Sequence, residues 1–214
     1  VVDGGSDDGT QELVRAYAAR DPRVRLLMAH PVPGGWNGKA WGLQTGLSRA
    51  DARSRWILTV DADVRPAPLL ARSLLWSARR SGIPALSVAT RQEVRGLSLG
   101  VVHPALLTTL VYRFGIPGQI GRRVAAVQAN GQCFLVRRDA LEACDGFRGV
   151  RASRCEDVTL ARLLVSAGRP VGFHETEDLV GVEMYQDGGE AWRNWPRSLT
   201  LRCLLYTSPS PRDR

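Results

Sequence analysis

Several kinds of binding site are missing from this sequence of 214 residues. Its four cysteines form no C-x-x-C pair and no Cys/His cluster with zinc spacing. Neither the G-x-G-x-x-G pattern of dinucleotide-binding proteins nor a P-loop occurs. No uninterrupted apolar run reaches the ~18 residues that a membrane-spanning helix needs. These absences disfavour a zinc protein, a dinucleotide-dependent enzyme and a P-loop enzyme.

Negative charge is also scarce: the sequence has 21 Asp and Glu residues and 29 Lys and Arg residues, which gives a net charge of +8. A basic surface favours anionic partners such as acidic lipid headgroups or phosphorylated substrates. The sequence has no block of Lys and Arg and no basic repeat interleaved with aromatic residues, so we expect no nucleic-acid partner. The 44% hydrophobic content is typical of a globular domain.

Apolar runs and helical patterns alternate along the first 90 residues. Helical spacing of apolar residues predicts helices over 10–20, 38–50 and 67–82, and apolar runs predict strands over 24–30, 55–60 and 84–90. Beyond them, we expect strands over 132–138, 170–174 and 179–185, and helices over 157–168 and 189–199. This order predicts an α/β fold with a mostly parallel sheet and helices on both faces. Ligands of such sheets bind beyond the carboxyl ends of the strands.

Two carboxylates follow the apolar strand 55–60 in the stretch TVDADVRP. Asp61 and Asp63 are two residues apart, so in an extended chain they point the same way and repel each other. A divalent cation would make this arrangement favourable, and short carboxylates suit Mg²⁺ or Mn²⁺ bound to diphosphate oxygens. An ordinary acidic loop is the structural alternative.

Two glycine-rich stretches near the N-terminus could bind a nucleotide. In VVDGGSDDGT, Asp3 ends a strand and could accept a hydrogen bond from a base, although a well-capped strand-to-helix turn explains the same residues. In PVPGGWNGKAWGLQTG, Lys39 lies at a helix start, which suits a phosphate, and a solvated lysine in a loop is the alternative.

Two later stretches suit the acceptor side of a transfer reaction. Glu156 and Asp157 open a helix in RASRCEDVTLARLLVSAG, where Asp157 could be a general base for a hydroxyl group, or both could simply cap the helix. In EMYQDGGEAWRNWPRSL, Trp192, Arg193 and Trp195 could form an aromatic wall for a sugar or lipid, or pack as an amphipathic helix.

Taken in this order, the motifs resemble those of the family 2 glycosyltransferases, which have the GT-A fold, a Rossmann-like sheet. VVDGGSDDGT is similar to the family's V-V-D-D-G-S-x-D-G-T, DAD to its metal-binding D-x-D, and CEDVTLAR to its E-D motif. NGQCFLVRRDALEACDGF resembles its acceptor-side stretch. The Met-Tyr and Glu-x-Trp segment is similar to that of membrane-associated bacterial enzymes of hopanoid and carotenoid type. Gly4 stands where the family usually has Asp, and a Q-x-x-R-W motif is absent, which argues for single-sugar transfer.

The resemblance implies an inverting, hexosyltransferase-type enzyme that moves one sugar from a nucleotide-diphosphate sugar, with UDP as the leading nucleotide, to a hydroxyl acceptor. A lipid is the candidate acceptor, and a membrane surface at the cytoplasmic face is the expected location of the full-length protein. Asp61 and Asp63 would hold Mg²⁺ or Mn²⁺. Asp3, Lys39 and Asp61 would bind the donor, and Asp157 with Glu156 would form the catalytic pair. His174 is a further candidate metal ligand.

The resemblance also sets the expected domain boundaries. Residues 1–202 correspond to a GT-A catalytic domain without its first strand and helix. Residues 203–214, with the sequence CLLYTSPSPRDR, resemble a translated sequencing adapter. Two alternative functions remain open at this point, a nucleotidyltransferase and a catalytically inactive binding or scaffold domain.

Overall fold

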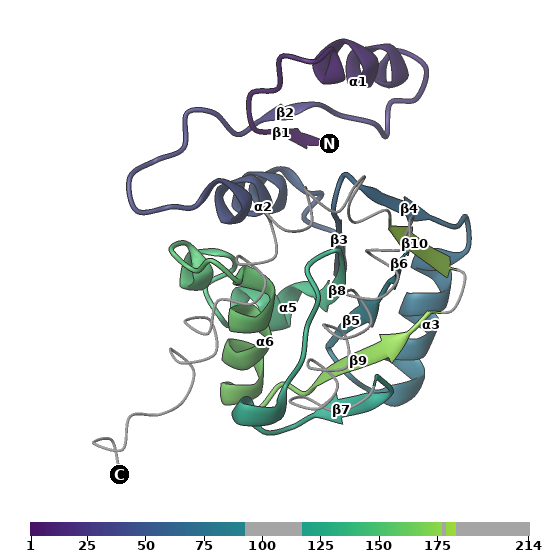
Figure 1. Ribbon diagram of the computed structural model, residues 1–214, viewed down its shortest axis with the longest axis vertical. Coiled ribbons are helices and arrows are strands. Elements are labelled where there is room, and N and C mark those ends of the chain that lie inside the picture. The colour runs from purple at the N-terminus through teal and green to yellow at the C-terminus, as the bar shows by residue number, and fades with distance from the viewer. Residues whose placement is uncertain (93–116, 177–178, 183–214) are drawn as a thin grey trace, which may run out of the picture.

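A mixed sheet of five strands forms the centre of the molecule in a computed structural model that describes residues 1–92, 117–176 and 179–182 (Figure 1). The strand order is β3-β8-β5-β9-β7. β3, β5 and β9 run in one direction, and β8 and β7 run against it. The bounds are β3 Trp56–Val60, β5 Ala85–Ala89, β7 Gln119–Gly121, β8 Cys133–Arg137 and β9 Val171–Glu175. The predicted α/β fold is therefore confirmed.

Two smaller sheets flank the central one. β4 (Val64–Pro66), β10 (Val180–Val182) and β6 (Arg91–Gln92) form a sheet in the order β4-β10-β6. β1 (Val2–Asp3) pairs in parallel with β2 (Leu27–Met28). β4 and β6 were not predicted, because strands of two or three residues are too short to show a period of two.

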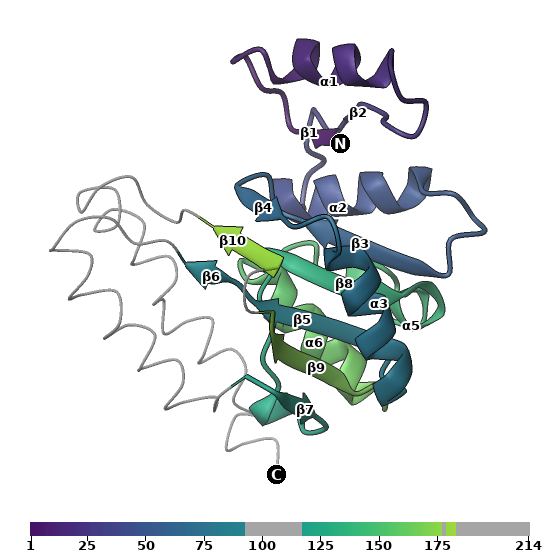
Figure 2. The same cartoon turned by 90° about the vertical axis from the view of Figure 1, so that its right-hand side faces the viewer.

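Helices cover both faces of the central sheet (Figure 2). α3 lies on one face, and α5 and α6 lie on the other. α2 lies between this core and the layer formed by α1, β1 and β2, as both views show. The helix bounds are α1 Thr10–Ala18, α2 Gly38–Arg49, α3 Leu70–Ser81, α5 Arg138–Glu142 and α6 Glu156–Ser166, with short 3₁₀ turns η1 Val124–Ala126 and η2 Arg148–Val150.

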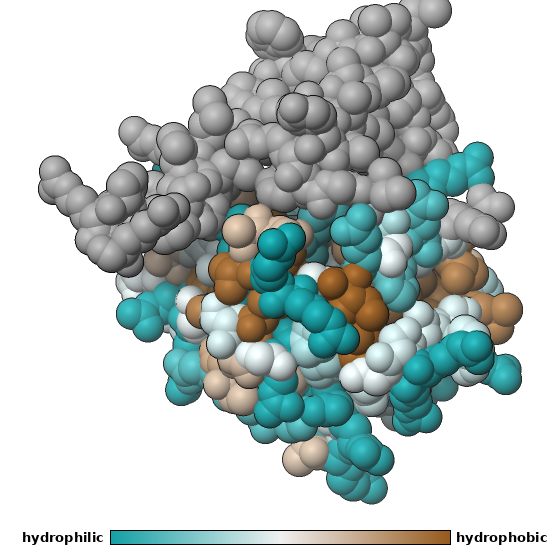
Figure 3. Space-filling view, turned by 90° about the horizontal axis from the view of Figure 1, so that it is seen from below, coloured by the Kyte–Doolittle hydropathy of each residue, from teal (hydrophilic) through white to brown (hydrophobic). Residues whose placement is uncertain are grey.

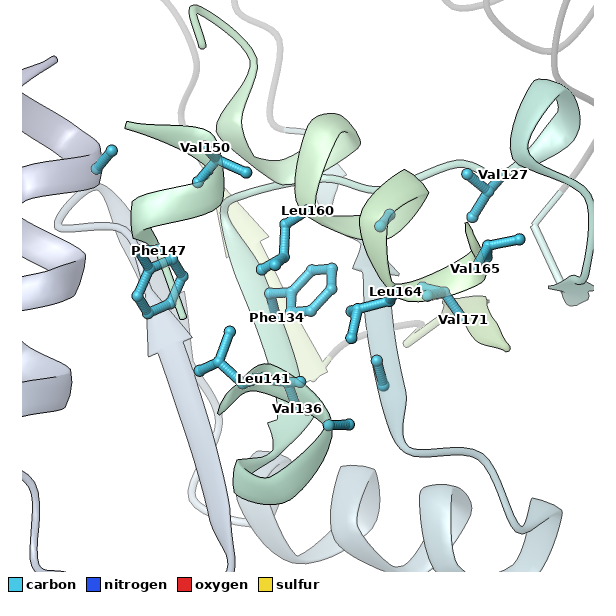
Figure 4. Packing of buried hydrophobic residues seen from close by; sticks show 14 residues of the cluster. Val127, Phe134, Val136, Leu141, Phe147, Val150, Leu160, Leu164, Val165 and Val171 are labelled. Carbon is cyan, nitrogen blue, oxygen red and sulfur yellow. The ribbon is translucent and has the colours of Figure 1, made fainter. Parts of the chain in front are cut away.

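Alternation along the strands sends neighbouring side chains into two separate cores. Phe134 and Val136 of β8 face α5 and α6, where they pack with Leu160 and Leu164 (Figure 4). The intervening residues of β8, with Leu86 of β5, face α3. The sheet is therefore buried on both sides, which explains why its strands read as continuous apolar runs in the sequence.

Truncating the α6 side of this core should destabilise the fold strongly. Leu164 is completely buried, so Leu164→Ala is expected to lower the free energy of unfolding by about 2–5 kcal/mol. Leu13 is 61% exposed on α1, and Leu13→Ala should change it by less than about 0.5 kcal/mol. Urea unfolding of both variants checks this, and equal losses would contradict the packing described.

The end of the molecule seen from below has a mixed surface. Hydrophobic and hydrophilic residues are interspersed on the described part of this face (Figure 3). Among the described residues, no helix has both the length and the hydrophobicity that crossing a membrane requires. The Trp-rich segment 189–199, whose likeness to membrane-associated enzymes is one basis of the membrane prediction, lies outside the described residues.

Candidate active site

The start of α2 is tied to the segment that precedes α6. Asn37 is the N-cap residue of α2, and its side-chain oxygen accepts a hydrogen bond of 2.7 Å from the backbone N–H of Ala40. Its side-chain amide donates to the carbonyl of Ser153, and its own N–H donates to the carbonyl of Arg151 at 2.7 Å. One asparagine therefore caps one helix and fixes its distance from the start of the other.

Lys39, the second residue of α2, lies between two carboxylates from different elements. Its Nζ is 2.8 Å from Oδ2 of Asp61, at the end of β3, and 3.0 Å from Oε1 of Glu156, the first residue of α6. Burial acts to lower the pKa of Lys39, but the charges of Glu156 and Asp61 outweigh it, so the pKa is raised. The ammonium group is therefore held charged, and it compensates a Glu156 side chain that is only 10% exposed.

A tight loop between β7 and β8 closes the site. The backbone N–H of Asn130 donates to Oγ of Ser87 at 2.6 Å, and Oγ donates back to the Asn130 carbonyl at 2.9 Å. The carbonyl of Gln132 accepts from the N–H of Asp61 at 3.0 Å. A Cβ atom on Gly131 would lie 3.0 Å from Nζ of Lys39 and 3.3 Å from Oδ2 of Asp157. A larger residue at this position would require Lys39 or Asp157 to shift by a few tenths of an ångström.

Asp157 lies beside the ion pair and is held by backbone donors. Its Oδ2 accepts from the N–H of Gly131 at 2.7 Å, and its Oδ1 accepts from the N–H of Val158 at 2.8 Å. Burial, followed by the neighbouring charge of Glu156, raises the pKa of Asp157 to about 6. A carboxylate with this pKa is ionised at neutral pH and still basic enough to take a proton. We refer to Lys39, Asp61, Glu156 and Asp157 as the carboxylate cluster.

Asp61 and Asp63 do not lie side by side as an extended chain would place them. The chain turns directly after β3, since the N–H of Val64 donates to the carbonyl of Asp61 at 3.2 Å. Asp61 faces Lys39, whereas Asp63 is exposed. The expectation of parallel carboxylates assumed that the strand continues through residue 63, and it ends at Val60.

These two carboxylates nevertheless suit a metal that is shared with a diphosphate. Within the described ranges, no three His, Cys, Asp or Glu side chains come together to hold a metal ion by themselves. Mg²⁺ usually takes one or two carboxylates and completes its shell with water and substrate phosphates. Asp61 already pairs with the ammonium group of Lys39, and the exposed Asp63 can approach a metal ion from solvent. The two carboxylates therefore fit a metal that they share with a diphosphate.

Asp3 organises its own loop. Its carboxylate accepts from the backbone N–H groups of Gly5 and Ser6, from the Ser6 hydroxyl and from the Gln11 amide. These bonds, led by that from the Ser6 hydroxyl, lower the pKa of Asp3. The side chain is buried at the end of β1, and a base N–H would have to share oxygens that already accept four donors.

The remaining predicted positions lie away from the cluster or outside the description. The structure does not bring His174 to the carboxylates: in β9 its Nδ1 faces Oγ of Ser77 on α3, at 3.4 Å. Trp192, Arg193 and Trp195 lie outside the described residues, as do residues 203–214. Three further residues have a clear role in the site, namely Asn37, Gly131 and Gln132. The sequence marks them only weakly: Asn37 precedes a predicted helix, and Gly131 and Gln132 belong to an N-G-Q stretch before an apolar strand.

The family described as glycosyl transferase family 2 matches residues 1–144. No curated protein sequence matches the chain.

Solved structures with similar folds include the following three. A mannosyltransferase from Pyrobaculum calidifontis, in complex with GDP-Man and Mn²⁺, has a TM-score of 0.64 and 21% identity, over 100% of this chain and 56% of that one. Mannosyl-3-phosphoglycerate synthase from Rubrobacter xylanophilus has a TM-score of 0.52 and 16% identity, over 100% and 64%. S. aureus TarS 1–349 with UDP-GlcNAc has a TM-score of 0.54 and 12% identity, over 89% and 50%. At these identities the likeness establishes the fold, and the chain spans little more than half of these proteins.

Proposed function

Because this chain belongs to glycosyl transferase family 2, we propose that it transfers one sugar from a nucleoside-diphosphate sugar to a hydroxyl acceptor, with inversion at the anomeric carbon. The observation that carries this proposal is the carboxylate cluster. Asp61 at the end of β3 and Glu156 at the start of α6 are 95 positions apart in the sequence, and both form ion pairs with Lys39. Both lie at the carboxyl edge of the parallel strands, where ligands of such sheets bind.

At the donor end, Asp61 and Asp63 would hold the divalent cation, Mg²⁺ or Mn²⁺. When bound, this metal would neutralise the negative charge that the departing diphosphate develops. The Pyrobaculum mannosyltransferase is complexed with GDP-Man and Mn²⁺, which supports Mn²⁺ as the first metal to test. Lys39 would remain beside Asp61 and add a second positive charge near the diphosphate, and Asp3 would keep the loop after β1 in shape for the nucleotide.

At the acceptor end, Asp157 would act as the general base. Its carboxylate takes the proton from the attacking hydroxyl as the oxygen forms a bond to the anomeric carbon. The bond from that carbon to the diphosphate oxygen breaks in the same displacement, and the nucleoside diphosphate leaves with the electron pair. The raised pKa of Asp157 and its fixed orientation between two backbone N–H groups support this role. Glu156 holds Lys39 in place beside it.

A lipid acceptor at the cytoplasmic face of a membrane is the finer part of this proposal. It is supported by the net charge of +8, which favours anionic headgroups. Trp192, Arg193 and Trp195 would line the acceptor, on the sequence resemblance alone. Two assays distinguish a lipid acceptor from a soluble one: binding to acidic liposomes and glycosylation of soluble acceptors. A chain that does not bind the liposomes and glycosylates only soluble acceptors would contradict a lipid acceptor.

Calorimetric titration of UDP, and then of GDP, tests the donor site of the whole chain. We expect binding in the presence of Mn²⁺ that EDTA abolishes. Asp63→Ala should weaken metal-dependent binding by about tenfold or more, because an exposed metal ligand is lost without changing the core. UDP is the first nucleotide to test, and GDP is the second.

The exposed Glu142 on α5 offers a control, since Glu142→Ala removes the same charge near the start of β3, at the opposite end of the strand from Asp63. This variant should bind like the wild-type chain. If neither nucleotide binds with Mn²⁺, or if Asp63→Ala and Glu142→Ala behave alike, an inactive binding or scaffold domain becomes the better description.

A further inference from the structure

A cavity lies on the opposite face of the sheet from the carboxylate cluster. It has a volume of about 550 Å³, within the roughly 300–1,000 Å³ that small-molecule sites occupy. One wall is the outer side of α3, and the other is formed by the end of β9 and the segment that leads to β10. Its described lining residues are Leu69, Arg72, Ser73, Leu74, Trp76, Ser77, Leu86, His174, Glu175, Thr176 and Leu179.

Apolar side chains dominate the walls and the rim of this cavity. Leu74 and Leu86 are buried at its base, where they belong to the core under α3. Leu69 and Trp76 stand at its rim and are 58% and 63% exposed. They are seven residues apart and so lie on the same side of the helix. Two large apolar side chains left in water beside a cavity indicate a surface that an apolar ligand would cover.

The polar groups of the cavity favour a negative charge at one end. Arg72 lines the cavity and, among the described residues, has no ion-pair partner. α3 contains no acidic residue, and it also carries Arg79 and Arg80, the second of which lies 5.2 Å from the centre of the Trp76 ring. Glu175 is the opposing charge in the lining. Two hydroxyl groups and an imidazole, on Ser73, Ser77 and His174, supply neutral hydrogen-bonding groups between the apolar walls.

We propose that this cavity binds an anionic amphiphile, with its hydrocarbon chain against Leu69, Trp76 and Leu179 and its acidic head group at Arg72. A hydrocarbon chain would cover Leu69 as well as Trp76, whereas a sugar or a base would stack on the tryptophan ring and leave the leucine exposed. A single guanidinium group suits a phosphate or a carboxylate through paired hydrogen bonds. The ligand is one amphiphilic molecule taken into a cavity, rather than a membrane surface on which the protein rests.

This site is separate from the proposed donor site. The strand order places β8 and β5 between β3 and β9, so about three strand spacings, roughly 14 Å, separate the two strands. The cavity opens on the α3 face, whereas the carboxylate cluster is built by α2 and α6, which pack on the other core. Binding in the cavity should therefore not require a nucleotide or a metal.

Calorimetric titration of the whole chain with dodecyl phosphate, below its micelle concentration, tests the proposal. We expect saturable binding of one molecule per chain. Arg72→Gln should weaken it about tenfold, because a charge-assisted hydrogen bond is lost. Trp76→Ala should weaken dodecyl phosphate and dodecanol by similar factors, whereas Arg72→Gln should leave dodecanol unchanged. Glu175→Gln should tighten dodecyl phosphate two- to threefold by removing the opposing charge.

The region of α1 offers matched controls, since Tyr17 in the helix is 58% exposed and Arg20, two residues beyond its end, is also exposed. Tyr17→Ala and Arg20→Gln therefore remove equivalent groups elsewhere. Both variants should bind dodecyl phosphate like the wild-type chain. Absence of saturable binding overturns the proposal, as do equal losses in the α1 and α3 variants. Binding only to vesicles of anionic lipid, and not to the monomeric probe, would instead indicate a membrane-docking face and would also overturn it. Ser73→Leu is a second variant, which narrows the cavity without removing a wall. It should also weaken the binding of dodecyl phosphate about tenfold.

Discussion

Asp157→Asn is expected to lower the rate of sugar transfer by about 10²–10⁴-fold, the usual contribution of a general base. Asn has the same shape, and its oxygen can still accept the hydrogen bond from Gly131 N–H, which is 2.7 Å long in the wild-type chain. Its NH2 group cannot accept the second bond, which Val158 N–H donates to Oδ1. What is lost is the ability to take a proton. Donor affinity, measured by calorimetry with Mn²⁺, should change by no more than two- to threefold, so the effect falls on kcat.

Glu156→Gln is the matched control for this variant. Glu156 is the neighbouring carboxylate and pairs with Lys39 at 3.0 Å, so it positions the cluster rather than accepting the proton. We expect a much smaller loss of kcat than for Asp157→Asn. Equal losses in the two variants, or a loss of donor affinity in Asp157→Asn, would assign Asp157 a structural role instead.

The raised pKa of Asp157 predicts that Asp157→Asn, which lowers the transfer rate, raises the stability of the fold at neutral pH. Burial raises this pKa to about 6, so the folded state binds a proton more tightly than the unfolded state. Stability from this group is therefore fully present at low pH and is lost as the pH rises through about 6. At pH 7 the ionised carboxylate costs stability, and Asn removes the charge. Asp157→Asn should be more stable than the wild-type chain at pH 7 by about 1–2 kcal/mol, because the cost of roughly 3 kcal/mol from the raised pKa is offset in part by the lost hydrogen bond from Val158 N–H. This gain should shrink as the pH falls from 6 and should be gone below about pH 4, where the carboxyl group is protonated in both the folded and the unfolded state.

The transfer rate has the reverse dependence, since the base must be ionised. Below about pH 6 the rate should fall close to tenfold for each pH unit, while the fold becomes relatively more stable. A residue that merely supports the fold would not separate rate from stability in this way. The comparison therefore distinguishes a chemical role of Asp157 from a packing role.

The elements of the fold could be predicted because burial on both faces leaves continuous apolar runs. The run 55–60 became β3, and the helical spacing in 67–82 became α3, which ends at Gly82 in the left-handed conformation. The pairing of those strands could not be predicted. β8 lies between β3 and β5 and runs against both, and no local pattern in the sequence encodes that insertion.

The same limit applies to the candidate site. A carboxylate pair after a strand and another at a helix start were visible as motifs, and the ion pairs between them were not. The approach of Lys39 to Glu156 depends on the Asn37 cap and on Gly131. Asn37 bonds to Ser153 and Gly131 lies beside Lys39, and each of these contacts spans more than 90 residues of chain. Sequence spacing reports on neighbours along one element, whereas this cluster is formed by the ends of three.

Lys39→Met is expected to lower the free energy of unfolding at pH 7 by about 1–3 kcal/mol, less than for a fully buried ion pair because Lys39 is 42% exposed. Without the ammonium group, Asp61, Glu156 and Asp157 repel one another, and Glu156 is left buried without a counter-ion. The loss should shrink near pH 5, where Asp157, whose pKa is about 6, becomes protonated and no longer repels its neighbours. Urea unfolding at both pH values measures it. Arg53 pairs with Asp51 on the surface, and Arg53→Gln should change stability by less than about 0.5 kcal/mol.

Mn²⁺ gives this variant its sharpest test. In the wild-type chain the ammonium group of Lys39 already supplies a positive charge to Asp61, 2.8 Å away. If the cluster is built to hold a cation, Mn²⁺ should raise the melting temperature of Lys39→Met more than that of the wild-type chain, and Lys39→Met/Asp61→Asn should lose most of this extra stabilisation. Equal stabilisation of all three proteins would show that the metal binds elsewhere. The lysine then only balances buried carboxylates, and the metal-assisted departure of the diphosphate would have no place in this site.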